Sequence, residues 1–193
     1  MSDRTRVTLI DKLKTGQNEK AWSEFYANYS GYLAAIIRNL NVDDGDIDDL
    51  LQKVMVTSWE KIPDLDYDPN KGRFRSWLAQ IARNTVMNHY TSTMRRAARM
   101  KQLADEPGED PDERIQAMAE KEWRIHVAKL AWESIRGNYE ENAVKAFDLI
   151  SEGKANKEVA EELGIKPNTV AVYKKRIIEA LRKEIRRLDA YLA

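Results

Sequence analysis

A short acidic segment divides this sequence of 193 residues into two parts. Leu103 to Asp112 reads LADEPGEDPD, with two prolines, one glycine and five acidic residues. Such a composition cannot bury a core and is typical of a flexible linker. Each flanking part must therefore build a small core of its own. We expect a first domain over residues 1–100, an acidic linker over 101–121 and a second domain over 122–193.

Apolar residues recur three or four positions apart in both parts, which is the spacing of one helix face. We find no strand-like alternation on which to base a sheet. The expected fold class is therefore all-α: two small helical domains joined by an acidic flexible linker. Asp46 is the expected N-cap of the second helix. Helices are predicted at residues 18–40, 46–61, 73–100, 113–135, 138–150, 156–163 and 167–188.

Composition excludes several classes of protein. The chain has no cysteine, which rules out disulfides, thiolate metal sites and thiol catalysis. Its two histidines, His89 and His126, lie far apart, and no glycine-rich phosphate-binding motif occurs. No apolar run approaches the ~18 residues of a membrane span, and the N-terminus does not read as a signal peptide. We expect a cytoplasmic protein with no catalytic residues, no metal, no cofactor and no small-molecule substrate.

Charge is strongly segregated along the sequence, although the net charge is zero. Residues 73–101 carry seven basic side chains and no acidic one, and residues 166–187 carry eight basic and two acidic side chains. Between them, residues 103–122 carry eight acidic and two basic side chains. Two basic blocks indicate two surfaces that face a polyanion. The alternative is that these runs are simply solvated helix faces.

The most specific motif lies at residues 154–178, KANKEVAEELGIKPNTVAVYKKRII. Asn156 can cap a short helix, and Gly164 stands where a left-handed residue is needed after it. Pro167 suits the first position of the next helix, which is basic. A short helix, a glycine turn and a basic second helix indicate a helix-turn-helix. An ordinary corner between two helices is the alternative, but the order of residues favours the DNA-binding motif.

This motif resembles region 4 of the extracytoplasmic-function (ECF) sigma factors of the sigma-70 family. Residues 46–62, DIDDLLQKVMVTSWEKI, resemble the helix of region 2 that binds core RNA polymerase, and residues 74–90, FRSWLAQIARNTVMNHY, resemble the segment that melts and reads the promoter −10 element. The resemblance covers residues ~18–95 and ~120–188. It implies a non-enzymatic subunit that directs core RNA polymerase to promoter DNA.

The resemblance also implies three sets of binding residues. The start of the second helix would dock on the polymerase's largest subunit, although its acids also suit the dipole at a helix N-terminus. Asparagines and cations of the third helix would meet unpaired −10 DNA, and the helix-turn-helix would read the −35 element. The core-binding set is Asp46, Asp48, Asp49, Leu50, Gln52 and Lys53. The −10 set is Tyr67, Asn70, Lys71, Arg73, Arg83, Asn84, Asn88, Arg95 and Arg96. The −35 set is Lys157, Lys166, Asn168, Thr169, Val172, Tyr173, Lys174, Lys175 and Arg176.

Two other classes of protein stay open at this point. A stand-alone helix-turn-helix regulator would explain the C-terminal half but needs no helical domain of ~80 residues before it. A nuclease or nucleotidyltransferase would need clustered carboxylates or a nucleophile, and we find no such cluster in the sequence. The sequence also leaves open whether an anti-sigma protein binds the chain.

Overall fold

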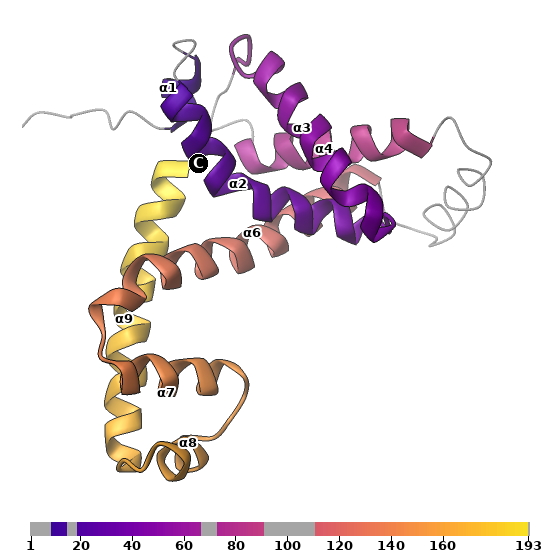
Figure 1. Cartoon of the computed structure of the whole chain (residues 1–193). Coiled ribbons are helices and arrows are strands. Elements are labelled where there is room, and N and C mark those ends of the chain that lie inside the picture. The colour runs from indigo at the N-terminus through magenta and orange to yellow at the C-terminus, as the bar shows by residue number, and fades with distance from the viewer. Residues whose placement is uncertain (1–8, 15–18, 67–72, 91–110, 193) are drawn as a thin grey trace, which may run out of the picture. The chain divides into compact units, whose positions relative to one another are not determined.

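The structure, a computed structural model, describes residues 9–14, 19–66, 73–90 and 111–192 (Figure 1). Every secondary-structure element within these ranges is a helix, which confirms the all-α prediction. The chain divides into two compact units. Unit 1 comprises residues 1–126 and 191–193, and unit 2 comprises residues 127–190.

Three helices form the body of unit 1: α2 (Glu19–Asn39), α3 (Ile47–Lys61) and α4 (Phe74–His89). Each of the three packs against the other two, and the short helix α1 (Leu9–Lys14) packs against α2 (Figure 1). The first half of α6 (Pro111–Ile135) completes the described part of this unit.

The core of unit 1 is built around large aromatic side chains. Tyr29 of α2 is fully buried, and its ring lies 5.6 Å from that of Phe74 on α4 in an edge-to-face arrangement. On its other side it stacks on Trp123 of α6, with the ring centroids 5.5 Å apart. Phe25 and Tyr32 add two further buried rings from α2. Aromatic pairs of this kind stabilise a core beyond the area that they bury, so the first half of α6 is an integral part of unit 1.

Local residues set the ends of α2 and α3. Asn41 follows α2 with φ of 57°, a left-handed conformation that asparagine tolerates better than most residues. Asp46 occupies the N-cap position of α3 but makes no side-chain capping bond. Its carboxylate Oδ2 lies 3.4 Å from Nε2 of His89 on α4 instead. The predicted cap is therefore in the right place, but its carboxylate faces a neighbouring helix.

The expected linker differs from the structure in its second half. We predicted a linker over residues 101–121 and a helix from residue 113. The helix is present as α6, which begins at Pro111, but its buried Ile115, Ala119 and Trp123 belong to unit 1 and not to a flexible linker. These three side chains recur every four residues, which places them on one face of the helix. The division between the units falls between His126 and Val127. The predicted helical residues 91–100 lie outside the described residues.

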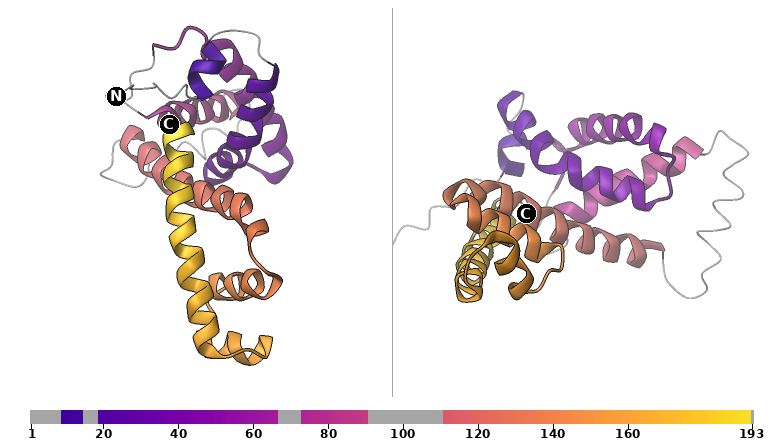
Figure 2. Two further views of the ribbon diagram at one scale, coloured as in Figure 1. Left: turned by 90° about the vertical axis from the view of Figure 1, so that its left-hand side faces the viewer. Right: turned by 60° about the horizontal axis from the view of Figure 1, so that its bottom comes forward.

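Unit 2 contains the second half of α6, the 3-10 turn Arg136–Asn138 and three further helices. These are α7 (Glu141–Ser151), α8 (Asn156–Leu163) and α9 (Pro167–Leu192), of which α9 belongs to this unit as far as residue 190. Figure 2 shows α7 and α8 beside the first turns of α9. The core between them is small and consists of Ala146, Val159, Ala160 and Val170, with Leu149, Ile150, Leu163, Ile165 and Tyr173 around it.

Candidate protein-binding and nucleic-acid-binding surfaces

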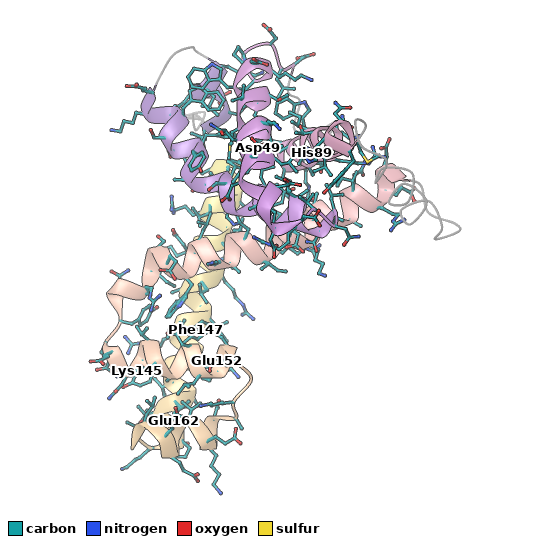
Figure 3. All side chains as sticks on the ribbon, turned by 45° about the vertical axis from the view of Figure 1, so that its right-hand side comes forward. Asp49, His89, Lys145, Phe147, Glu152 and Glu162 are labelled. Carbon is teal, nitrogen blue, oxygen red and sulfur yellow. The ribbon has the colours of Figure 1, made fainter. Side chains whose placement is uncertain are left out.

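The predicted docking face lies at the N-terminal end of α3. Asp48, Asp49, Gln52 and Lys53 are exposed, and Asp49 is labelled on α3 in Figure 3. Asp49 and Lys53 form an ion pair one helical turn apart, and such exposed pairs contribute little to stability. Both side chains can therefore exchange their mutual contact for contacts with a partner at low cost.

Leu50 does not belong to this face. Its side chain is fully buried in unit 1, so the prediction that it contacts a partner is wrong. The physical reason is helix geometry: Ile47, Leu50, Leu51 and Val54 form the stripe that packs inward, and the acids alternate with that stripe. Asp46 is half-buried beside His89 and lies at the edge of the face.

An apolar groove of about 530 Å³ lies between α2 and α3. Trp22 of α2 and Trp59 of α3 pack together in it, with their ring centroids 4.2 Å apart. Tyr26, Val56 and Trp59 are each about half exposed. Helical spacing alone places Tyr26 in the apolar stripe of α2 and Trp59 in that of α3. The structure places them at the margin, because a stripe wider than one contact face leaves its outermost members at the surface.

The predicted −10 set divides into three groups. Tyr67, Asn70, Lys71, Arg95 and Arg96 lie outside the described residues. Asn84 and Asn88 are exposed one turn apart on α4, so both amides face solvent on the same side of the helix. Arg73 and Arg83 instead lie beside carboxylates of α6. We expected the reading face of α4 to be free of acids, and the tertiary structure brings acids to one edge of it.

Arg75 makes a buried structural contact that sequence reasoning missed. We counted it with the basic surface, but it is only 6% exposed. Its Nε and Nη2 donate hydrogen bonds to Glu120 at 3.0 and 3.1 Å, and its guanidinium lies over the ring of Trp123. Its backbone carbonyl accepts a hydrogen bond from the hydroxyl of Tyr32 at 2.9 Å. Burial raises the pKa of Tyr32, and the nearby Glu120 raises it further, so this hydroxyl stays a neutral donor.

The helix-turn-helix in unit 2 has the predicted geometry at its turn. Gly164 adopts φ of 65° after α8, and α9 begins at Pro167. The cap of α8 differs from the prediction, because Ala155 rather than Asn156 occupies the N-cap position. The backbone N–H of Ala155 donates to the carboxylate of Glu158 at 2.7 Å, so a glutamate in the first turn, and not Asn156, makes a side-chain contact at this helix start.

The start of α9 presents most of the predicted −35 set to solvent. Thr169, Tyr173 and Lys174 are half-buried. The hydroxyl of Tyr173 donates a hydrogen bond to Glu140, which raises the pKa of that hydroxyl, and its ring borders the unit 2 core. Tyr173 therefore joins α9 to the start of α7 more than it faces outward. Exposed side chains are Lys157, Lys166, Asn168, Val172, Lys175 and Arg176.

Comparison with known families assigns both units. The family described as Sigma-70 region 2 matches residues 25–96, which include α3, α4 and most of α2. The family described as bacterial regulatory proteins, luxR family, matches residues 144–186, which include α8 and most of α7 and α9. The luxR-type match alone would also suit a stand-alone regulator, but such a regulator has no need of region 2. The two matches occur in the order predicted for a sigma factor, with region 2 first and a helix-turn-helix second, and together they support sigma factor function with core RNA polymerase and promoter DNA as partners.

Other comparisons add little to this assignment. No curated protein matches the sequence. A solved structure of CnrH in complex with the cytosolic domain of CnrY is 23% identical and covers 94% of this chain and 96% of that chain. Its TM-score of 0.37 is too low to support any assignment of residues or partners. Among the described residues, no helix is long and apolar enough to cross a membrane.

Proposed function

We propose that this sigma factor binds core RNA polymerase, the −10 element and the −35 element through three different exposed helix faces. The start of α3 docks on core RNA polymerase, α4 holds the unpaired −10 element, and the start of α9 reads the −35 element in duplex DNA. The observation that supports this best is the pair Asn84 and Asn88, which leaves two amide groups in solvent on a helix whose opposite side is packed in the core. The protein acts without enzymatic chemistry, in the cytoplasm where the polymerase works.

The docking face of α3 combines acid and amide groups at a helix N-terminus. Asp48 and Asp49 lie in the first turn, and Gln52 follows on the same side as Asp48 and Asp49. An acidic rim of this kind complements basic residues on a partner helix and mainly sets specificity and association rate. Leu50 supports the face from inside, by fixing α3 against the core of unit 1.

The α4 face suits unpaired DNA because of its amide groups. An asparagine side chain both donates and accepts hydrogen bonds, as the edge of a base requires. Inside a duplex, the Watson–Crick edges are already paired, so Asn84 and Asn88 gain full contact only after the strands separate. Open-complex formation should therefore depend on these residues more strongly than initial binding does.

The α9 face offers one residue per helical turn to the major groove. Asn168, Val172 and Arg176 are exposed and spaced four apart. Asparagine can pair with adenine, arginine with guanine, and an apolar side chain can contact the methyl group of thymine. Lys157, Lys166, Lys174 and Lys175 are placed to meet phosphates, which fix position without reading sequence.

Transcription in vitro tests the proposal. The sigma factor with core polymerase should initiate at specific promoters in genomic DNA, whereas neither component alone should do so. The double variant Asn84→Ala/Asn88→Ala should retain the closed complex but lose most permanganate reactivity of the −10 thymines. A matched control is Gln116→Ala on α6, which is exposed and outside all three faces. Permanganate reactivity equal to that of the wild type would contradict the role of α4.

A further inference from the structure

Three arginines at one edge of α4 each lie beside a carboxylate of α6. Arg73 Nη1 donates to Glu120 Oε2 at 2.8 Å, and Arg75 donates twice to the same carboxylate. Arg83 Nη1 lies 3.8 Å from Asp112 Oδ1. All these residues belong to unit 1. The basic edge formed by Arg73, Arg75 and Arg83 is therefore paired with acids of the same chain.

The strength of these contacts differs along the edge. Arg75 is almost fully buried, so its pair with Glu120 fixes α6 in place, and an unpaired guanidinium there would be costly. The side chain of Arg73 is 57% exposed and that of Asp112 is 65% exposed, and exposed ion pairs contribute little. One anchoring contact is thus flanked by two weak contacts that an incoming anion could replace.

A phosphate oxygen and a carboxylate oxygen compete for the same guanidinium hydrogens. Arginine binds both groups in the same forked geometry. The Ile115, Ala119 and Trp123 stripe presses α6 against unit 1, so the carboxylates of Asp112 and Glu120 are held close to the arginines. A DNA strand that approaches this edge must displace them, and its apparent affinity falls by the fraction of molecules in which the edge is covered.

We propose that residues 112–123 of α6 form an intramolecular cover over the basic edge of α4, in which Glu120 and Asp112 occupy the places of DNA phosphates. The free sigma factor therefore binds single-stranded DNA weakly, and removing or displacing these two carboxylates strengthens that binding. The proposal adds regulation to the −10 face and depends on the proposed function of α4. A purely structural role for the same ion pairs is the competing explanation, and it predicts lost stability with no gain in affinity.

The first test compares two glutamate-to-glutamine variants of the full chain. Glu120→Gln weakens the contact with Arg73 and Arg75 while keeping an amide oxygen as a hydrogen-bond acceptor. Glu113→Gln is the control, because Glu113 is exposed on the same helix and is in none of the ion pairs between α4 and α6 that involve described residues. Affinity for a fluorescein-labelled, mixed-sequence 20-nucleotide single strand is measured by anisotropy, and folding is checked by circular dichroism.

We expect Glu120→Gln to bind the strand at least fivefold more tightly than Glu113→Gln. Because the exposed guanidinium of Arg73 becomes available while Arg75 stays buried, the salt slope should also steepen by about 0.7. Equal affinity and equal slope in two folded variants would overturn the cover. Asp112→Asn serves as a second variant in case Glu120→Gln unfolds, because Asp112 is mostly exposed. Its affinity for the single strand should exceed that of Glu113→Gln by a smaller factor than the affinity of Glu120→Gln does.

A reversible cross-link tests the cover without comparing variants. The natural chain has no cysteine, so Arg83→Cys and Asp112→Cys introduce the only two thiols. A bismaleimide with a disulfide in its spacer would hold the first turn of α6 against α4, and reduction would let that turn move away while Ile115, Ala119 and Trp123 stay packed. The bridged protein should bind the single strand more weakly than the same protein after reduction. Unchanged affinity on reduction would overturn the proposal.

Failure of the cover and failure of the proposed function give different results. If the wild-type sigma factor with core polymerase opens promoters but free-chain affinity does not respond to Glu120→Gln or to the cross-link, the cover alone is wrong. If Asn84→Ala/Asn88→Ala leaves promoter opening unchanged, the role of α4 is wrong, whatever the free chain does.

Discussion

The basic residues at the edge of α4 in unit 1 and at the start of α9 in unit 2 differ in whether they are paired with acids of the same chain. In unit 1, the arginines at the edge of α4 are paired with Glu120 and Asp112 of α6. In unit 2, the start of α9 presents Lys166, Lys175 and Arg176 to solvent. Under the proposed function, α9 reads duplex DNA, so its target exists before the strands separate and its cations can stay exposed. The proposed −10 face of α4 meets its target only after the strands separate, so covering its basic edge would limit electrostatic binding to other nucleic acid before then.

The cores of the two units differ in a parallel way. Unit 1 packs large rings such as Tyr29, Phe74 and Trp123, whereas unit 2 packs small side chains such as Ala146 and Ala160. A large aromatic core resists deformation and can carry an additional helix. A core of small side chains brings α8 close to α9, as a helix-turn-helix requires. Substitutions should therefore act differently in the two units: truncation should be worst in unit 1 and enlargement worst in unit 2.

The largest effect is expected from Phe74→Ala in unit 1. Phe74 is fully buried and touches the rings of Phe25, Tyr29 and Trp77. Removing such a ring leaves a cavity and should lower the free energy of unfolding by about 3–5 kcal/mol. Urea unfolding followed by tryptophan fluorescence would measure this change. A loss under about 1 kcal/mol would show that the aromatic core is not what holds unit 1 together.

Ala160→Leu tests the small core of unit 2. Ala160 is 3% exposed between α7, α8 and α9, so three extra carbons must push these helices apart. Overpacking of this kind should destabilise unit 2 by roughly 1–3 kcal/mol and weaken duplex binding, because the recognition helix shifts. Ala171→Leu is the control, since Ala171 is exposed on α9. Equal stability of the two variants would mean that the close approach of α8 and α9 does not depend on a small side chain.

These contrasts also explain what the sequence could predict. Helical spacing and local turn residues placed α2, α3 and α8 within one or two residues of their observed bounds, because Asn41, Gly164 and Pro167 act on their own backbone. The role of α6 in unit 1 was missed, because its acids suggested a solvated linker. The fourfold spacing of Ile115, Ala119 and Trp123 was the available signal.

The binding residues were harder to predict than the helices. Periodicity predicts that a helix has an apolar stripe facing the core. Tertiary packing determines which members of the stripe are buried, such as Leu50, and which lie at its solvent-exposed margin, such as Trp59. The pairing of Arg75 with Glu120 joins residues 45 positions apart, and no local pattern encodes it. Charge counting treated every arginine of residues 73–101 as available, whereas availability depends on which acids the fold brings near.

Arg176→Ala should have a smaller effect than the core substitutions, and one confined to DNA binding. Arg176 is exposed, so stability should hardly change. Loss of one base contact should cost about 1–3 kcal/mol of binding at the preferred site and relax the preference at a single base pair. Binding to a panel of −35 duplexes, each changed at one position, would measure this. A uniform loss across the whole panel would reassign Arg176 to a phosphate contact.

The smallest expected effect compares one cation from each unit in the free protein. Lys175 is exposed on α9, so Lys175→Ala should reduce the salt slope for duplex DNA by about 0.9 without changing sequence preference. Arg73 is paired with Glu120, so Arg73→Ala should leave the salt slope for single-stranded DNA almost unchanged in the wild-type background. In the Glu120→Gln background, the same substitution should reduce that slope by about 0.7, because the guanidinium is then available to phosphate. Anisotropy titrations across a salt series would measure both slopes. If Arg73→Ala had the same effect in both backgrounds, the basic edge of unit 1 would be as open as that of unit 2, and the difference between the two units would lie in their cores alone.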